Sequence, residues 1–145
     1  MYFMLKGIPK IISPELMKVL MEMGHSDEIV IADGNFPAGT CASNYLVRCD
    51  GHNVPEILDA ILNLFPLDPY VEAPVALMEV VPGDKIVPVI WDQYEEIIKK
   101  HEKNIKIENI ERFAFYERAK KAYAIVATGE EALYANIILK KGVVK

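Results

Sequence analysis

The stretch Glu28-Ile29-Val30-Ile31-Ala32-Asp33-Gly34 indicates the fold class of this chain. Its four consecutive apolar residues, three of them β-branched, are typical of a buried β-strand. The dipeptide Asp33-Gly34 that follows is a turn signal. The stretch therefore predicts a short buried strand that ends at Asp33.

The residues upstream of this strand predict a helix. Ser13 supplies a hydroxyl cap, Pro14 suits the first turn, and Glu15 faces the positive end of the helix. Apolar residues then recur at i, i+3, i+4 and i+7, as expected for one buried helical face: Leu16, Val19, Leu20 and Met23. Gly24 is expected to end this helix in the left-handed conformation.

Helix and strand patterns alternate along the rest of the chain. Further strands are expected at residues 45–48, 75–81, 105–107, 122–127 and 136–139, and further helices at residues 53–65, 91–101 and 112–121. This alternation predicts an α/β protein in which residues 1–145 form a single-domain α/β/α sandwich with a central, largely parallel sheet. Ligands of such sheets bind at the carboxyl ends of the strands, where Asp33, Thr128 and Gly129 are expected.

Composition excludes several classes of protein. The net charge is −5 and the basic residues are dispersed, which argues against a nucleic-acid partner. Apolar stretches such as residues 123–127 are far shorter than the ~20 residues of a membrane span. Residues 1–10 lack the pattern of a secretory signal. We therefore expect a cytoplasmic protein with no membrane or nucleic-acid partner.

No familiar cofactor or metal motif is present. The chain contains no glycine-rich nucleotide-binding motif and no G-x-S-x-G nucleophile elbow. Cys41, Cys49 and His52 are close in sequence but lack the C-x-x-C spacing of structural zinc sites. The sequence therefore favours free thiols and no metal site.

His25 and Asp33 flank the first strand, and each has two interpretations. His25 could simply favour the end of the preceding helix, or it could transfer protons, since its ordinary pKa of ~6.5 suits that chemistry near neutrality. Asp33 could form a turn, or it could hold a sugar hydroxyl or orient a histidine. Spacing alone leaves both pairs of alternatives open.

Two later segments carry further candidate residues. The run from Arg112 to Arg118 is rich in aromatic residues, and its composition fits a helix with one aromatic face and one charged face. Tyr134-Ala135-Asn136 offers a phenol, a backbone segment and an amide that suit sugar hydroxyls, although such residues are also ordinary where strands begin.

The chain resembles the fucose mutarotase and ribose pyranase family in several segments that occur in the same order. The resemblance runs over nearly the whole chain, on residues 5–9, 13–16, 23–33, 111–118 and 128–142. It implies an α/β subunit in a ring-type homo-oligomer, commonly a decamer, which needs no cofactor or metal. It also implies that His25 is the catalytic acid/base, that Asp33 binds the sugar, and that Tyr134, Ala135 and Asn136 add substrate contacts.

One position separates the two branches of this family. Ribose-type members carry a histidine where fucose-type members carry an arginine followed by Phe-x-Phe-Tyr-Glu-Arg. This chain has Arg112 and the run 113–118, so it resembles the fucose branch, with L-fucose as the expected substrate and with Arg112 and Tyr116 as substrate-binding residues. Ala135 departs from that branch, which more often has glycine there. A ribose pyranase and a non-catalytic sugar-binding oligomer remain the alternatives.

Overall fold

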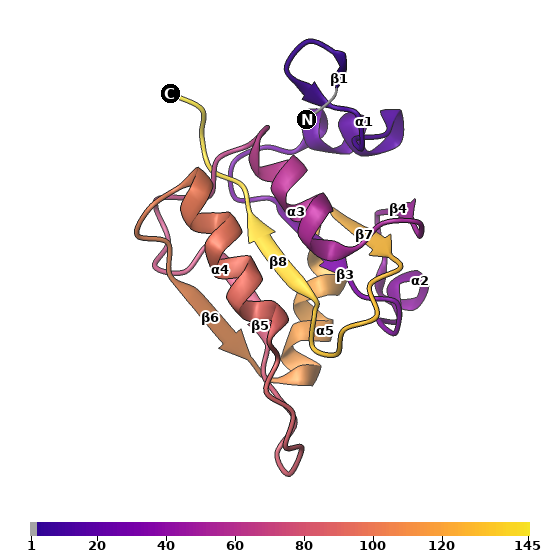
Figure 1. The fold of residues 1–145 in the computed structure, drawn as a ribbon, viewed down its shortest axis with the longest axis vertical. Coiled ribbons are helices and arrows are strands. Elements are labelled where there is room, and N and C mark those ends of the chain that lie inside the picture. Colours follow the sequence, from indigo (N-terminus) through magenta and orange to yellow (C-terminus); the bar gives the residue numbers. More distant parts are fainter. Residues whose placement is uncertain (1–2) are drawn as a thin grey trace.

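The chain folds into three layers, with helices on both faces of a six-stranded sheet (Figure 1). The structure is a computed structural model that describes residues 3–145. Across the sheet the strands follow the order β4 (Tyr45–Cys49), β7 (Ala124–Thr128), β3 (Glu28–Ala32), β8 (Ile137–Lys140), β5 (Val75–Met78) and β6 (Ile107–Ile110). A separate antiparallel pair consists of β1 (Phe3–Leu5) and β2 (Ile8–Pro9).

Strand β8 is the one strand of the six-stranded sheet that runs against the others. It pairs antiparallel with β3 on one side and with β5 on the other, whereas the remaining neighbours pair in parallel. Ile137, the first residue of β8, therefore lies opposite Ile31 near the end of β3. The predicted α/β class with a largely parallel sheet is confirmed, and the reversal of β8 brings the residues before it to the edge where β3 and β5 end.

The two faces of the sheet have separate apolar cores. Helices α1 (Pro14–Glu22), α3 (Val54–Leu62) and α4 (Ile90–His101) cover one face, and α2 (Ala38–Cys41) and α5 (Arg112–Lys121) cover the other. Ile29 and Ile31 pack into the first core, and Val30 and Ala32 into the second. Because successive strand residues point to opposite faces, a strand covered by helices on both sides is continuously apolar.

In α1, the start of the helix agrees with the sequence prediction, and its end does not. The hydroxyl of Ser13 accepts a hydrogen bond from the Leu16 amide at 3.1 Å, as predicted for a cap. The prediction for Gly24 is wrong: Gly24 lacks a positive φ, and the left-handed residue of this connection is Ser26, with φ of 71°. The Asp27 carboxylate accepts from the Gly24 amide at 2.7 Å, so a side chain caps this turn.

Other boundaries also differ from the predictions. The strand expected at residues 105–107 lies at β6, and the strand expected at residues 75–81 ends at Met78. Residues 79–89 instead form a long connection between β5 and α4 that projects from the body of the molecule (Figure 1). Within residues 3–145, no helix combines the length and the apolar character needed to cross a membrane.

The segment after β7 depends on a glycine at position 129. The Gly129 amide donates to the His52 carbonyl at 2.9 Å, and a Cβ atom on Gly129 would overlap the backbone carbonyl oxygen of Asp50. We expect Gly129→Ala to lower the free energy of unfolding by about 1–3 kcal/mol, because backbone must move to admit the methyl group. Denaturant unfolding measures this, with Gly39→Ala as the control, since a Cβ there meets no atom within 4 Å. Equal stability of the two variants would contradict the prediction.

Candidate functional site

A cleft lies at the edge of the sheet where β3 and β5 end, β8 begins and α5 begins. Its volume is about 270 Å³. The cleft contains five of the seven predicted site residues, namely Asp33, Arg112, Tyr116, Tyr134 and Asn136. Because residues from four segments converge there, the cleft follows from the strand directions and not from closeness in sequence.

Asp33 and Asn136 are buried against each other at the floor of this cleft. The Asp33 amide donates to the Asn136 side-chain oxygen at 2.7 Å. The Asp33 carboxylate accepts from the amides of Asn35 at 3.0 Å and Ala135 at 3.4 Å. Burial raises the pKa of the Asp33 carboxyl, and these backbone amides oppose that effect. Both oxygens of Asp33 are therefore held in place, as a fixed acceptor for a ligand hydroxyl requires.

Ala135 contributes backbone only. Its side chain is buried, and its amide holds Asp33 while its carbonyl accepts from the Tyr94 hydroxyl at 2.7 Å. The Ala135 side chain therefore does not line the cleft, and the residue acts on the site through the backbone amide that holds Asp33.

Arg112 and Tyr116 enter the cleft from the first two turns of α5. The guanidinium of Arg112 lies over the Phe113 ring, 4.5 Å from its centroid. The Tyr116 ring makes an edge contact with Phe36, with the ring centroids 5.6 Å apart. The helix thus contributes one cation and one phenol, supported by aromatic neighbours, to the cleft that also contains the Asp33 carboxylate.

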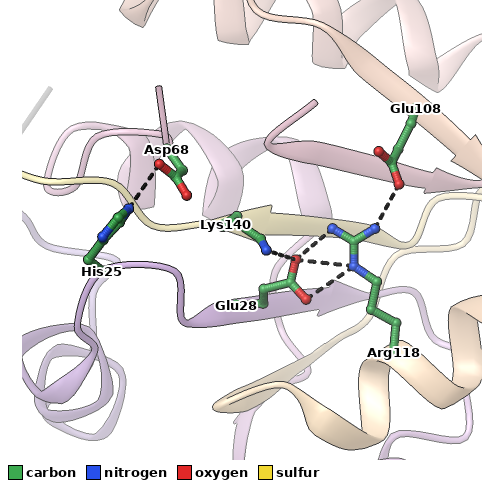
Figure 2. Close-up of polar contacts among 6 residues, drawn as sticks. All are labelled: His25, Glu28, Asp68, Glu108, Arg118 and Lys140. Carbon is green, nitrogen blue, oxygen red and sulfur yellow. Dashed lines mark hydrogen bonds and ion pairs between the residues drawn. The ribbon is translucent and has the colours of Figure 1, made fainter. Parts of the chain in front are cut away.

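Arg118, in the same helix, has a different role. Its guanidinium donates to both carboxylate oxygens of Glu28, at 3.1 and 2.6 Å, and to Glu108 at 2.9 Å (Figure 2). The hydrogen bonds to Glu28 raise the pKa of Arg118 further above its already high ordinary value. Lys140 lies 4.0 Å from the same Glu28 carboxylate. This cluster joins α5 to three strands, so the arginine stabilises the fold and does not reach the cleft.

His25 lies at the opposite edge of the sheet from the cleft. It precedes β3, whereas Asp33 follows it, and the five residues of this strand span roughly 16 Å at ~3.3 Å per residue. The His25 side chain is 45% exposed, and its Nε2 lies 3.0 Å from Oδ1 of Asp68 (Figure 2). The ring also makes an edge contact with Tyr70, at 5.3 Å between centroids. A monosaccharide in the cleft is therefore out of reach of the same chain's His25.

Asp68 is the polar residue at this second location that the sequence did not reveal. Its side chain is only 2% exposed, and it accepts from the Tyr70 amide at 3.0 Å as well as facing His25. Burial alone would raise the pKa of the Asp68 carboxyl, but the Tyr70 amide, the His25 ring and the charge of Lys140 leave it below its ordinary value. An ionised carboxylate only accepts hydrogen bonds, so Asp68 faces Nε2 of His25 as an acceptor.

The cysteines do not assemble a metal site. Cys41 and Cys49 are buried and free, and burial raises the pKa of both thiols. His52 faces Glu56 at 3.3 Å. Over residues 3–145, no three histidine, cysteine, aspartate or glutamate side chains gather as ligands for a metal ion.

Comparison with known proteins gives consistent matches. Residues 6–144 match the RbsD / FucU transport protein family. The chain is 54% identical to the fucose mutarotase of Danio rerio, over 97% of this chain and 94% of that one. It is 55% identical to the L-fucose mutarotase of Actinobacillus pleuropneumoniae serotype 5b (strain L20), over 97% of both chains. A solved structure of the Streptococcus pneumoniae fucose mutarotase in complex with L-fucose is 60% identical, with a TM-score of 0.93, over 97% of this chain and 100% of that one.

Proposed function

Because the chain belongs to the RbsD / FucU transport protein family, we propose that it is a mutarotase that interconverts the α and β anomers of L-fucose. The observation that carries the proposal is the convergence of Asp33, Arg112, Tyr116, Tyr134 and Asn136 on one cleft. These side chains supply a carboxylate, a cation, two phenols and an amide, which together suit the several hydroxyls of a free sugar.

The reaction needs proton transfer and no covalent intermediate. Removing the proton of the anomeric hydroxyl while the ring oxygen gains one breaks the bond between the anomeric carbon and the ring oxygen. The resulting free aldehyde rotates about one carbon–carbon bond and closes on the other face. An imidazole that accepts the first proton and returns it to the ring oxygen balances the step, and such catalysis contributes about 10²–10⁴-fold. We assign this role to His25.

Asp68 orients His25 for that transfer. Since the ionised carboxylate accepts a hydrogen bond from the N–H at Nε2, the nitrogen left to exchange a proton with the sugar is Nδ1. The T-shaped contact with Tyr70 limits rotation of the ring. The geometry of this pair supports a base whose tautomer is set before the sugar arrives.

The active site is shared between subunits. Because His25 and the cleft lie at opposite edges of one sheet, His25 of one subunit serves the cleft of its neighbour. A head-to-tail contact of this kind, repeated with a rotation that closes, builds a ring. The separation along β3 therefore supports the ring-type homo-oligomer that the sequence resemblance implies.

The proposed function is tested by saturation-transfer NMR of the anomeric protons of L-fucose, with D-ribose alongside. Faster exchange between the α and β anomers of L-fucose as protein is added is the expected result. Acceleration only between the ring forms of D-ribose would move the chain to the pyranase alternative. Sugar binding without acceleration of either sugar would support the non-catalytic alternative.

Loss of the Asp68 carboxylate tests the orientation of His25. We expect Asp68→Asn to lower kcat/KM for L-fucose by about 10–100-fold, because a charge-assisted hydrogen bond to the catalytic ring is lost. Asp59→Asn is the matched control. The Asp59 carboxylate also faces a histidine, His101, with 2.6 Å between its Oδ1 and the ring Nε2, and this pair does not line the cleft. Similar losses in the two variants, measured by the same NMR exchange, would show that Asp68 is merely structural.

A further inference from the structure

Tyr134 adopts an uncommon backbone conformation within the cleft. Its φ is +56°, in the left-handed region that bulky residues rarely occupy. The indole Nε1 of Trp91 donates to the Tyr134 carbonyl at 2.7 Å, which holds this conformation from the side of α4. Strained residues of this kind persist where the surroundings fix them and are concentrated at functional sites.

The hydroxyl of Tyr134 is also held by two hydrogen bonds. Its hydroxyl donates to Oδ2 of Asp84 at 2.7 Å and accepts from the amide of Val81 at 3.3 Å. Both partners belong to the connection 79–89 between β5 and α4, and both line the cleft. The tyrosine therefore ties this projecting connection to the segment that precedes β8.

Asp84 itself is placed by a tight turn. The Asp84 amide donates to the Val81 carbonyl at 3.0 Å, across Pro82 and Gly83. Gly83 has a φ of +92°, which is the conformation that a type II turn requires after proline. Oδ1 of Asp84 accepts from the Ile86 amide at 3.1 Å, which leaves Oδ2 for the tyrosine. The carboxylate is thus oriented before any ligand binds.

These contacts determine what Tyr134 can offer a sugar. The hydrogen bond to Asp84 is the largest effect that raises the pKa of Tyr134, with burial adding to it and the charge of Arg112 opposing it. The phenol therefore keeps its proton, and that proton is directed to Asp84. The lone pair that remains on the oxygen can only accept a hydrogen bond from a sugar hydroxyl.

We propose that Asp84 is a positioning residue that acts through Tyr134 and fixes one wall of the sugar cleft as a hydrogen-bond acceptor. The inference rests on the proposed function for its substrate. Asp84 lies outside the segments on which the sequence resemblance depends. The acceptor that Asp84 fixes favours a sugar hydroxyl that points toward Tyr134. Tyr134 then binds the sugar and does not deliver a proton.

The test compares Asp84→Ala with Asp84→Asn, which keeps an acceptor oxygen. We expect Asp84→Ala to raise KM for L-fucose about tenfold with kcat changed less than about twofold, and Asp84→Asn to restore KM to within about threefold of the starting value. Asp92→Ala is the control, because Asp92 is an exposed carboxylate in the first turn of α4 that does not line the cleft. An unchanged KM in Asp84→Ala would overturn the proposal.

A double substitution shows whether Asp84 acts through Tyr134. Adding Asp84→Ala to Tyr134→Phe should change KM no further than Tyr134→Phe alone, and independent effects that multiply would overturn the proposal. Exchange of the Val81 amide with solvent, measured by NMR without sugar, should accelerate in Asp84→Ala and not in Asp84→Asn. This readout needs no activity, so unaltered exchange overturns the positioning role, whereas an inactive parent protein overturns only the proposed function.

Discussion

Replacing His25 by alanine is expected to lower kcat for anomer exchange of L-fucose by about 10²–10⁴-fold, the usual contribution of a general acid–base group. The fold should survive, because the side chain is 45% exposed and its described contacts are with Asp68 and Tyr70. Saturation-transfer NMR measures the exchange rate, and thermal unfolding of the same sample reports on the fold.

His52→Ala is the matched control for this experiment. His52 has a similar exposure of 44% and also faces a carboxylate, Glu56. It lies in the loop before α3 and does not line the cleft. The control variant should exchange L-fucose at the parent rate. A rate for His25→Ala equal to that of His52→Ala would remove His25 from the mechanism.

Mixing two inactive variants is expected to restore activity if sites are shared between subunits. One chain carries His25→Ala, and the other carries Arg112→Glu, which reverses the charge of an exposed cleft residue. In randomly mixed rings of equal proportions, about one quarter of the sites combine an intact His25 with an intact neighbouring cleft. Co-expression with two affinity tags, followed by purification on both, yields the mixed rings for the exchange measurement.

A chain carrying both substitutions makes the outcome quantitative. Mixed equally with the unaltered chain, it should leave about one quarter of the parent activity when sites are shared and about one half when each chain is self-sufficient. Recovery in the first mixture with one quarter in the second supports the shared site. No recovery in the first mixture, with one half in the second, would contradict it.

The sequence predicted the elements whose signals are local. The cap at Ser13 follows from a hydroxyl, a proline and an acidic residue in sequence, the bounds of α5 follow from the spacing of its apolar residues, and the apolar run before Asp33 predicted β3 correctly. The end of α1 was predicted incorrectly because the Asp27 side chain caps the Gly24 amide, so Gly24 does not need the left-handed conformation.

The features that arise from three-dimensional pairing were not visible in the sequence. Nothing in the apolar run of β8 distinguishes an antiparallel from a parallel neighbour. Asp68, between two prolines near β8, shows no pattern that links it to a histidine 43 residues earlier. The cleft residues were predicted as a set by family resemblance, and the structure brings five of them together; their roles, and that of His25, stay predictions.

The placement of His25 and the cleft at opposite edges of one sheet has a consequence for regulation by mass action. Under the proposed site shared between subunits, catalytic competence belongs to the contact between neighbours, so dilution that separates subunits is expected to lower the turnover per chain without unfolding any of them. A sugar held between two subunits opposes that separation, since a ligand stabilises the state that binds it. Abundant sugar would therefore preserve the assembly that acts on it. When sugar is scarce, subunits would separate, and turnover would fall more steeply than if each chain held an independent site.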